Sequence, residues 1–581
     1  MSKKVSEFLQ RIFPLTGQIR YMDRSDLRND AVAGITVAVM LVPQGMAYAM
    51  LAGLPPVIGL YASTIPLIIY AFLGTSRHLA VGPSALVSLL VFTGVSALAD
   101  PGTDTYIQYV LALSILIGII QVALGVARAG FIVNYISQAV IGGFTSAAAV
   151  IIAISQAGHI LGFDIPRHGS IFVKLTHIAR HIGDVHLPTC ILGISSIALL
   201  VIFKTIGLRR TGPLLVVLAA TLATGLFRLD GDGVAIVANV PRGIPLPFLP
   251  ALVPEILKDL LPVALTIAFI GYMESYAIAQ SIATRERQII DPDRELTALG
   301  AADIAAGIFS GYPVTGGLAR TAVNFAAGAR TGLAGIITAS MIGLTLAFFT
   351  PLFHYLPITA LAAVIIIAVS SLFDYRQFQE LLRVKFGDGL TFLFTFMVTL
   401  TGGVETGILS GVVLSLLLFI RRSAHPHMAE LGFCHERNAY LNINRFPMVE
   451  RYAHTVIIRV DGSIFFANAG FVKTRTRQWI ESQPDTRLVI FDFEGVNDMD
   501  AVAVKMLENL IDDYDTRRVD FAFARLKGPV RDILTRAGWH RKYPHSIRFR
   551  SVRQVISDLG ITSSNGFSRR DSQVDSTGPD G

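Results

Sequence analysis

Two short stretches decide the fold: residues 79–90, LAVGPSALVSLL, and residues 311–325, GYPVTGGLARTAVNF. In each, a Pro/Gly break launches an apolar run of roughly 10–15 residues, whereas a helix that crosses a bilayer needs about 20. The two runs are the third and the tenth of about fourteen apolar segments, so each is the third in a block of seven. Broken segments at corresponding places in two halves indicate an inverted-repeat transporter with a site near the middle of the membrane.

The composition is that of a membrane protein. Hydrophobic residues make up 52% of the 581 residues and charged residues only 16%, against about 25% charged in an ordinary soluble protein. The first 422 residues hold 49 charged residues and the last 159 hold 42, so a soluble domain is expected after about Ser423. The predicted spans are 31–51, 56–73, 82–97, 106–126, 131–155, 187–206, 213–227, 256–283, 296–311, 317–327, 332–350, 356–372, 388–402 and 405–420.

The placement of basic residues predicts the orientation in the membrane. With the N-terminus in the cytoplasm and alternating spans, 20 Lys and Arg residues fall on the cytoplasmic side and six outside, which is the bias of cytoplasmic loops. Both termini are therefore expected in the cytoplasm, and a net charge of +7 needs no nucleic acid to explain it. In the N-terminal segment 1–29, Val5, Phe8, Leu9 and Ile12 fall at helical spacing and predict an amphipathic helix on the membrane surface; the alternative is a disordered leader.

Several kinds of chemistry are disfavoured by what the sequence lacks. Cys190 and Cys434 are the only cysteines, so no four-cysteine zinc site exists, and without a GK dipeptide there is no nucleotide-binding P-loop. We expect neither an enzyme nor a cofactor. His177 and His181 could share a helix face as metal ligands, but no carboxylate or thiol supports them, so we favour a solvated loop over 162–186. The other histidines in or beside this loop are His159, His168 and His186.

The two broken segments predict an anion site. A helix that starts inside the membrane directs unsatisfied N–H groups at one point, and its dipole adds about half a positive charge there. Two such ends facing each other can hold an anion without a metal. Ser84 lies at the first end, and Ala319 and Arg320 lie at the second. A buried arginine costs at least ~2.5 kcal/mol at mid-bilayer, so we favour an anion-binding Arg320 over one that snorkels to the membrane face.

Glu274 is the second charge within an apolar segment. A buried carboxylate either takes a proton or finds a cation, and both options suit coupling of transport to protons or sodium. The alternative is a structural ion pair with Arg320, and the two readings are compatible. Asp303, in the ninth segment, is a weaker candidate because that segment borders the expected site.

The chain resembles the sulfate permease (SulP) family of anion transporters. The resemblance covers about residues 20–560 and is carried by DAVAGITVAVMLVPQGMAYAMLAGLPPVIGLYAS from Asp30, by GFTSAAAVIIAISQ from Gly143 and by the two stretches quoted first. It implies an α-helical polytopic membrane protein with a 7+7 inverted repeat over 30–422, divided into core and gate domains. It further implies an elevator mechanism, a homodimer in the cell membrane's lipid bilayer, and a small inorganic or organic anion as substrate.

The resemblance also implies a set of site residues. The first segment supplies Gln44 and Tyr48, the third Ser84 and Ala85, the eighth Glu274, and the tenth Ala319 and Arg320. Relatives often carry serine at the position of Ala319, so backbone N–H groups and Arg320 are expected to carry more of the binding here. Members that act as motors carry an aromatic residue at the position of Ser84, and the small residue here favours a transporter.

The function expected from these features is proton-coupled sulfate symport. The alternatives are a sodium-coupled bicarbonate transporter, a dicarboxylate transporter, an uncoupled anion channel or motor, and a membrane sensor. A channel needs no titratable carboxylate within the membrane, so Glu274 favours a coupled transporter.

The tail is expected to be a small cytoplasmic α/β domain. Residues 423–437 are taken as a linker, 438–561 as a domain that resembles a STAS domain, and 562–581 as disordered. In relatives of this domain a serine after the loop matching Asp498-Met499-Asp500 is phosphorylated, but Ala501 and Val502 cannot accept phosphate. The expected strands are 454–460, 464–468, 488–493 and 519–526, and the expected helices are 501–514 and 530–537.

Overall fold

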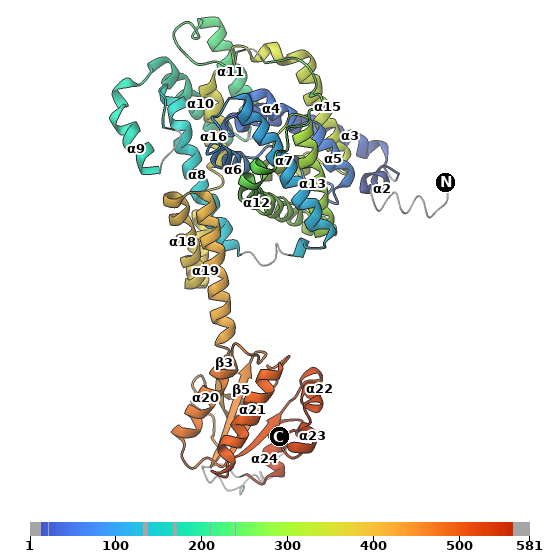
Figure 1. The fold of residues 1–581 in the computed structure, drawn as a ribbon, viewed down its shortest axis with the longest axis vertical. Helices are drawn as coiled ribbons and strands as arrows, with labels where there is room; N and C mark the ends of the chain where they lie inside the picture. Colours follow the sequence, from blue (N-terminus) through green and yellow to red (C-terminus); the bar gives the residue numbers. More distant parts are fainter. Residues whose placement is uncertain are drawn as a thin grey trace, which may run out of the picture. The chain divides into compact units, whose positions relative to one another are not determined.

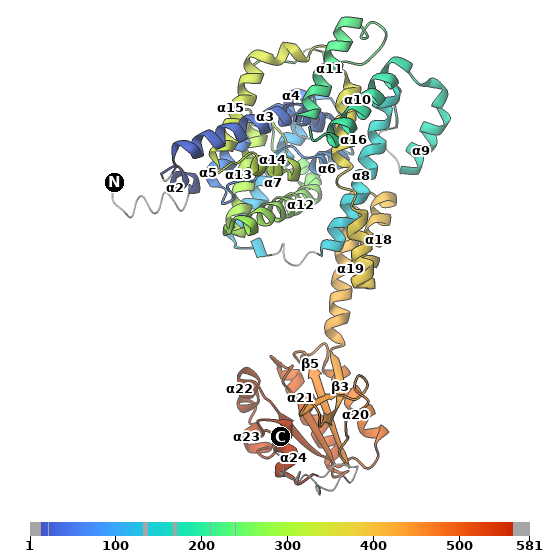
Figure 2. The ribbon, with the colours of Figure 1, turned by 180° about the vertical axis from the view of Figure 1, so that it is seen from behind.

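The computed structural model describes residues 13–20, 22–131, 137–166, 171–208, 211–238 and 240–561. The predicted N-terminal amphipathic helix and the predicted disordered tail lie outside these residues. The chain divides into two compact units, Met1–Ser415 and Leu416–Gly581. The first is helical and the second contains a sheet (Figures 1 and 2).

Each of the fourteen predicted spans falls on a helix. The helices are α3 (Arg24–Leu51), α4 (Pro56–Tyr61), α5 (Ile65–Leu73), α6 (Ala85–Val95), α7 (Asp104–Val126), α8 (Gln138–Leu161), α10 (Leu187–Thr205), α11 (Gly212–Phe227), α12 (Pro254–Glu286), α13 (Pro292–Ile308), α14 (Leu318–Ala326), α15 (Leu333–Leu344), α16 (Ile358–Val369), α18 (Phe386–Gly402) and α19 (Val404–Ala424). The spans 56–73 and 332–350 are interrupted, by a break between α4 and α5 and by two further helical turns after α15, Thr345–Phe349 and Thr350–Phe353.

Eight of the described helical stretches are long and apolar enough to cross a membrane. The two broken segments are the short helices α6 and α14, about 16 and 14 Å long at 1.5 Å per residue, so each is about half of a span. In the described part of the first unit, three α-helices were not predicted: α2 (Pro14–Arg20), α9 (Ile171–Arg180) and α17 (Tyr375–Val384). The expected solvated loop over 162–186 therefore contains helix α9.

The helix contacts in the two halves correspond as expected for an inverted repeat. Counting segments in the two halves pairs α3 with α12, α6 with α14, α7 with α15, α8 with α16 and α10 with α18. Helix α3 packs on α14 and α15, and its counterpart α12 packs on α6 and α7. In the same way α8 packs on α18, and α10 packs on α16. The predicted 7+7 architecture is confirmed.

The contact between α7 and α13 requires glycine on both helices. A Cβ atom on Gly118 of α7 would lie 2.4 Å from the carbonyl oxygen of Gly300 on α13, and one on Gly300 would lie 2.7 Å from the carbonyl oxygen of Gly118. Real Cβ atoms do not approach backbone so closely, so the two helices touch through bare backbone, as small residues allow in membranes.

Two buried carboxylates hold the two halves together. Asp30 of α3 accepts hydrogen bonds from the backbone N–H groups of Arg330 (2.6 Å) and Thr331 (3.1 Å) in the second half. Glu295 of α13 accepts from the Tyr70 hydroxyl (2.6 Å) and the Thr75 N–H (2.6 Å) in the first half. A buried charge is tolerated when its acceptor sites are filled in this way.

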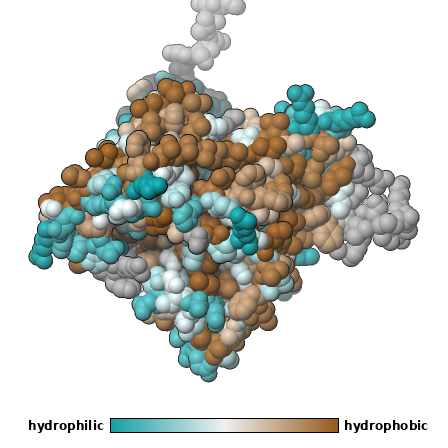
Figure 3. All heavy atoms as spheres, turned by 90° about the horizontal axis from the view of Figure 1, so that it is seen from above, coloured by the Kyte–Doolittle hydropathy of each residue, from teal (hydrophilic) through white to brown (hydrophobic). Residues whose placement is uncertain are grey.

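Apolar side chains face outward on the first unit. The most exposed of them on α10 and α11 include Leu187, Ile191, Leu222 and Leu226, which is expected of helices that meet lipid rather than water. Hydrophobic residues also cover most of the face drawn in Figure 3.

The second unit is a five-stranded sheet with helices, in the order β4-β3-β5-β6-β7. Strands β5, β6 and β7 run parallel, and β3 and β4 pair antiparallel at one edge. The strands are β3 (His427–Cys434), β4 (Ala439–Asn442), β5 (Thr455–Asp461), β6 (Leu488–Asp492) and β7 (Asp520–Ala524). The helices are α20 (Ala469–Ser482), α21 (Ala501–Asp515), α22 (Gly528–Arg536), α23 (Trp539–Lys542) and α24 (Val552–Asp558).

Two predictions for the tail are wrong. The expected linker 423–437 contains β3, which pairs with β5 and belongs to the sheet. The expected strand 464–468 is a turn, because the Asn468 side chain accepts from the Phe465 N–H (2.8 Å) and donates to the Ser463 carbonyl (3.0 Å), which curls the chain before α20. The other five predicted elements correspond to β5, β6, β7, α21 and α22.

Candidate functional site

The two short helices start from one small ladder. Strand β1 (Val81–Gly82) precedes α6, and strand β2 (Thr315–Gly316) precedes α14. The strands pair antiparallel, with Val81 opposite Gly316 and Gly82 opposite Thr315. The half-helices, both labelled in Figure 2, therefore begin side by side from opposite halves of the chain.

The ladder is fixed to its neighbours by side-chain hydrogen bonds. The Ser275 hydroxyl of α12 lies 2.6 Å from the Thr315 hydroxyl and accepts from the Gly316 N–H at 2.8 Å. Asp303 of α13 is buried and accepts from the Val314 N–H at 2.7 Å. Asp303 is absent from the residues that line the cavity described next, so its place in the structure is that of a support for the loop before α14.

All seven predicted site residues line one cavity of about 380 Å³, here called the Arg320 cavity. They are Gln44 and Tyr48 from α3, Ser84 and Ala85 at the start of α6, Glu274 from α12, and Ala319 and Arg320 from α14. The tenth segment was predicted to meet the third at this place, and the structure brings them together with the first and the eighth.

Arg320 lies at the centre of this arrangement and is only 2% exposed. Its Nη1 donates to the Pro83 carbonyl in the first half of the chain, and its Nη2 donates to the Thr315 carbonyl (3.4 Å) in the second half. Its Nε is buried and has no hydrogen-bond partner. The guanidinium is thus oriented by the backbone of both halves, and its Nε–H remains unused.

Glu274 faces the same cavity with an unused acceptor. Its Oε2 is buried and has no hydrogen-bond partner. Among the described residues no ion pair within 4.0 Å joins Glu274 to Arg320, so the alternative of a direct structural ion pair does not hold in this structure. A carboxylate with an unused acceptor and a guanidinium with an unused donor therefore line one cavity.

The half-helix ends differ in how they are capped. The Ser84 hydroxyl accepts from the Val87 N–H at 3.3 Å, which uses one of the free donors of α6. Helix α14 begins after Gly317 with no side-chain cap, so its first N–H groups have no side-chain acceptor. Ala319, in this first turn, brings no hydroxyl to the cavity, and the main chain is the donor there.

Sequence reasoning missed the opposite wall of the cavity. It is formed by Leu200, Phe203 and Lys204 of α10, by Leu208 in the connection to α11, by Gly212 and Pro213 at the start of α11, and by Val364, Ile367, Ala368, Ser371 and Leu372 in or after α16. These helices look like any apolar span in the sequence, so only the inverted repeat could have indicated that they face the site.

Two other predicted features lie away from the cavity. The His177 and His181 rings stack with their centroids 4.0 Å apart, and no group of three metal-ligating side chains occurs in the part of the chain that the structure describes. In the second unit, Asp500 caps α21 by accepting from the Ala503 N–H at 2.8 Å. Ala501 and Val502 follow it without a hydroxyl group.

Comparisons with known proteins agree with this architecture. The profile of the Sulfate permease family matches residues 27–395, and that of the STAS domain matches residues 446–554. The chain is 36% identical to "Sulfate transporter 4.1, chloroplastic" of Arabidopsis thaliana over 92% of its own length and 80% of that protein. It is 35% identical to a probable sulfate transporter of Mycobacterium tuberculosis over 90% of its own length and 93% of that protein.

Solved structures share the fold at low sequence identity. The murine Solute Carrier 26 family member A9 anion transporter in the inward-facing state superposes with a TM-score of 0.87 at 23% identity, over 96% of both chains. The transmembrane domain of the cyanobacterial bicarbonate transporter BicA superposes with a TM-score of 0.60 at 20% identity, over 68% of this chain and 98% of that one.

Proposed function

The chain belongs to the sulfate permease family, and we propose that it is a secondary active anion transporter that carries sulfate together with protons. The observation that carries this proposal is the Arg320 cavity. There two half-helix N-termini, an arginine with an unused donor and a carboxylate with an unused acceptor meet in one space. The names of the relatives from Arabidopsis thaliana and Mycobacterium tuberculosis support sulfate as the anion.

The anion is proposed to lie between the ends of α6 and α14. The helix dipoles add positive potential there, and the free N–H groups of both first turns donate to its oxygens. The Arg320 Nε supplies a charge-assisted hydrogen bond, which is stronger than a neutral one. Gln44 and Tyr48 close the site from α3.

Glu274 is proposed to couple transport to protons. Entry of an anion into a negative-inside cell is opposed by about 2.3 kcal/mol per charge for each 100 mV, so a divalent anion needs co-transported cations to accumulate. A proton on Glu274 neutralises one negative charge in the loaded cavity, and Arg320 neutralises another. A sodium ion at Glu274 would do the same, and that would make the protein a sodium-coupled transporter.

The side on which the cavity opens supports an alternating-access cycle. Its far wall includes Lys204, Leu208, the start of α11 at 212–213 and residues 371–372 after α16. The bias of basic residues assigns these ends to the cytoplasm together with both termini. We propose that this is the inward-facing state. Helices α3, α6, α12 and α14 would carry the anion as an elevator core, and α8, α10, α16 and α18 would form the gate of a homodimer in the cell membrane.

Uptake into proteoliposomes tests the proposal. Purified full-length protein should accumulate radiolabelled sulfate when the outside is acidified, and Arg320→Ala should abolish uptake while the protein stays folded. Arg330→Ala, an exposed arginine ten residues further along, is the matched control and should transport normally. Accumulation of bicarbonate under a sodium gradient, or of fumarate, in place of sulfate would reassign the substrate. Near-normal uptake by Arg320→Ala would refute the site.

A further inference from the structure

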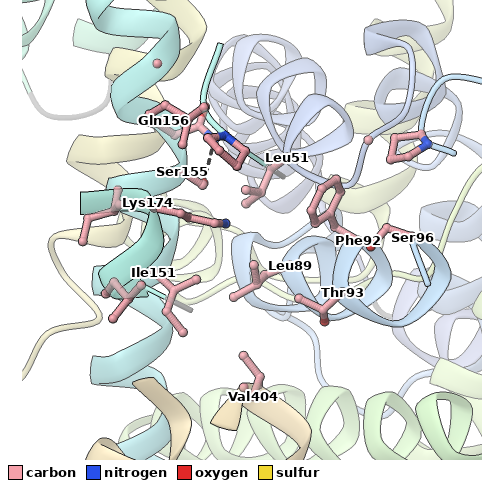
Figure 4. Close-up of a pocket in the computed structure, with 18 of the residues that line it drawn as sticks. Leu51, Leu89, Phe92, Thr93, Ser96, Ile151, Ser155, Gln156, Lys174 and Val404 are labelled. Carbon is pink, nitrogen blue, oxygen red and sulfur yellow. Dashed lines mark hydrogen bonds between the residues drawn. The ribbon is translucent and has the colours of Figure 1, made fainter. Parts of the chain in front are cut away.

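A second cavity, of about 690 Å³, lies elsewhere in the helical unit and is here called the Lys174 cavity. It is lined by the end of α3, by α6, α8 and α9, and by residues 399–404 (Figure 4). None of the seven predicted site residues lines it. Sequence analysis gave no function to any residue around it.

The two cavities follow each other along the same helices. On α6, Ala85 and Leu86 line the Arg320 cavity, and Leu89 and Phe92 line the Lys174 cavity. Three residues of helix span about 4.5 Å, so less than one turn of α6 separates the two linings. On α3, Tyr48 lines the first cavity and Met50 lines the second, which again places the two spaces end to end.

The Lys174 cavity opens on the side opposite to the Arg320 cavity. Its rim includes the connections at 53–55, 101–102, 163–166 and 402–403. Alternation of the spans from a cytoplasmic N-terminus puts all four connections outside. The second cavity is therefore placed as the outer approach to the anion site.

Helix α9 turns Lys174 and Ile171 toward this cavity and leaves other apolar side chains exposed. Phe172 and Val173 are 60% and 48% exposed, while Lys174 is half-buried. Figure 4 shows the Lys174 side chain reaching into the space toward Leu51 and Leu89. A water-exposed helix would be expected to do the reverse, so this orientation needs a reason.

The charges around Lys174 leave its ammonium group available. Asp164, exposed at the rim, is the carboxylate that lines the cavity, and no ion pair within 4.0 Å links it to Lys174 among the described residues. His159 is also on the lining. Burial lowers the pKa of the Lys174 ammonium group, because removal from water disfavours a charge, and a bound anion would offset that cost.

Polar side chains also line the Lys174 cavity. Thr93 of α6 donates its hydroxyl to the Leu90 carbonyl at 3.2 Å, and Ser96 lies just after α6. Ser155 of α8 donates its hydroxyl to the Ile152 carbonyl at 2.7 Å and accepts from the Gln156 amide at 3.1 Å. A hydroxyl has one hydrogen to donate, and in Thr93 and Ser155 it is already used, so the Lys174 ammonium group is the main donor for an anion here. The rest of the lining is mostly apolar, which keeps the interaction with the ammonium group poorly screened.

We propose that the Lys174 cavity is an outer anion-binding site, in which the Lys174 ammonium group holds an oxyanion before it enters the Arg320 cavity. This inference rests on the proposed function, because it assumes that an anion crosses between the two cavities. It adds a second site, on the opposite side of the barrier, which loads the first by raising the local concentration of anion.

Kinetics of uptake and efflux test this site. Full-length protein is expressed in cells that lack sulfate uptake of their own, and initial rates are measured from either side. Lys174→Gln should raise KM for external sulfate about tenfold, which corresponds to about 1.4 kcal/mol, with kcat unchanged. KM for efflux of internal sulfate should stay the same, because the site faces outward. If the carrier also moves chloride, the rise in its external KM should be only about threefold, because its charge is half as large.

Matched variants separate charge from structure. Lys174→Arg keeps the charge and should restore the external KM, and Lys258→Gln removes an exposed lysine from the same predicted side and should change nothing. Lys174→Met provides a second neutral variant should Lys174→Gln fold poorly, and efflux with normal kcat shows that either is folded. A normal external KM in both neutral variants, or an equal rise in KM from both sides, overturns the outer site alone. Absence of sulfate transport in the wild type overturns the proposed function and this inference together.

Discussion

Replacement of Gly317 by alanine tests whether the position of the Arg320 guanidinium decides anion affinity. A Cβ atom on Gly317 would lie 2.6 Å from Cζ, 2.7 Å from Nη2 and 2.8 Å from Nε of Arg320. An ordinary contact is at least 3.4 Å, so the guanidinium must move by nearly 1 Å. The hydrogen bond from Nη2 to the Thr315 carbonyl is already 3.4 Å long and would be lost.

The size of the effect follows from the bonds at risk. A hydrogen bond to a charged group contributes about 1.5–3 kcal/mol, so the loss of one such bond between Arg320 and the anion should weaken sulfate affinity about 10- to 100-fold. Gly271→Ala is the matched control, because its Cβ would meet nothing closer than 3.8 Å. Sulfate binding is measured on purified full-length protein by calorimetry. Wild-type affinity in Gly317→Ala, with the protein folded, would refute the reasoning.

Three further substitutions have definite expected outcomes. Glu274→Gln should still bind and exchange sulfate but should no longer concentrate it under a pH gradient, and undiminished proton-driven accumulation would contradict the proton role. Asp30→Asn should lower the free energy of unfolding by about 2–3 kcal/mol, since a charged acceptor of backbone N–H groups is lost, and a thermal melt of the purified protein measures this. Burial raises the pKa of Asp461, but hydrogen bonds from Arg459 and His427 outweigh it, so the pKa lies below 3.8. Asp461 therefore stabilises its domain above about pH 4 and loses that contribution as the pH falls through its lowered pKa. Asp461→Asn should flatten this dependence in an acid titration followed by tryptophan fluorescence, because both tryptophans lie in the second unit; an unchanged acid midpoint would contradict the assignment.

The site could be predicted from sequence because it departs from the pattern around it. Arg320 and Glu274 are charges in apolar segments, and a Pro/Gly break precedes each half-helix. Such departures lower stability, so they are expected mainly at functional sites. The opposite wall of the Arg320 cavity, with Leu200, Phe203 and Val364, could not be predicted in this way, because an apolar residue facing a cavity has the same sequence signature as one facing lipid.

Buried acidic residues show a second limit of prediction from sequence. Asp303 and Glu295 lie in the same helix and are both fully buried, yet each serves a backbone loop and not the cavity. Glu274 leaves an acceptor unused, and this difference exists only in three dimensions. The same holds for Lys174, whose proposed role depends on the face that α9 turns toward the cavity.

The tail was misread where local composition and long-range pairing disagree. Residues 464–468 are rich in strand formers, but the Asn468 side chain bonds to its own turn and prevents a strand. Residues 427–434 become a strand only because β5 supplies a partner edge. Strand propensity judged from a few neighbouring residues reveals neither the Asn468 turn nor the pairing with β5.

The uncapped start of α14 has a consequence for how this protein tolerates mutation. Most donors proposed to face the anion are peptide N–H groups, and these are present whichever side chain the codon specifies. In saturation mutagenesis of the site, most substitutions of Arg320 and Gly317 should therefore abolish transport, whereas substitutions of Ala319 should have mild effects. Proline, which removes the N–H itself, would be the informative exception in the first turn, because there it deletes a donor without disturbing the helix. Because these donors belong to the main chain, substitutions that change only side chains leave most of them in place. The sequence of the site can therefore vary while its anion-binding groups remain.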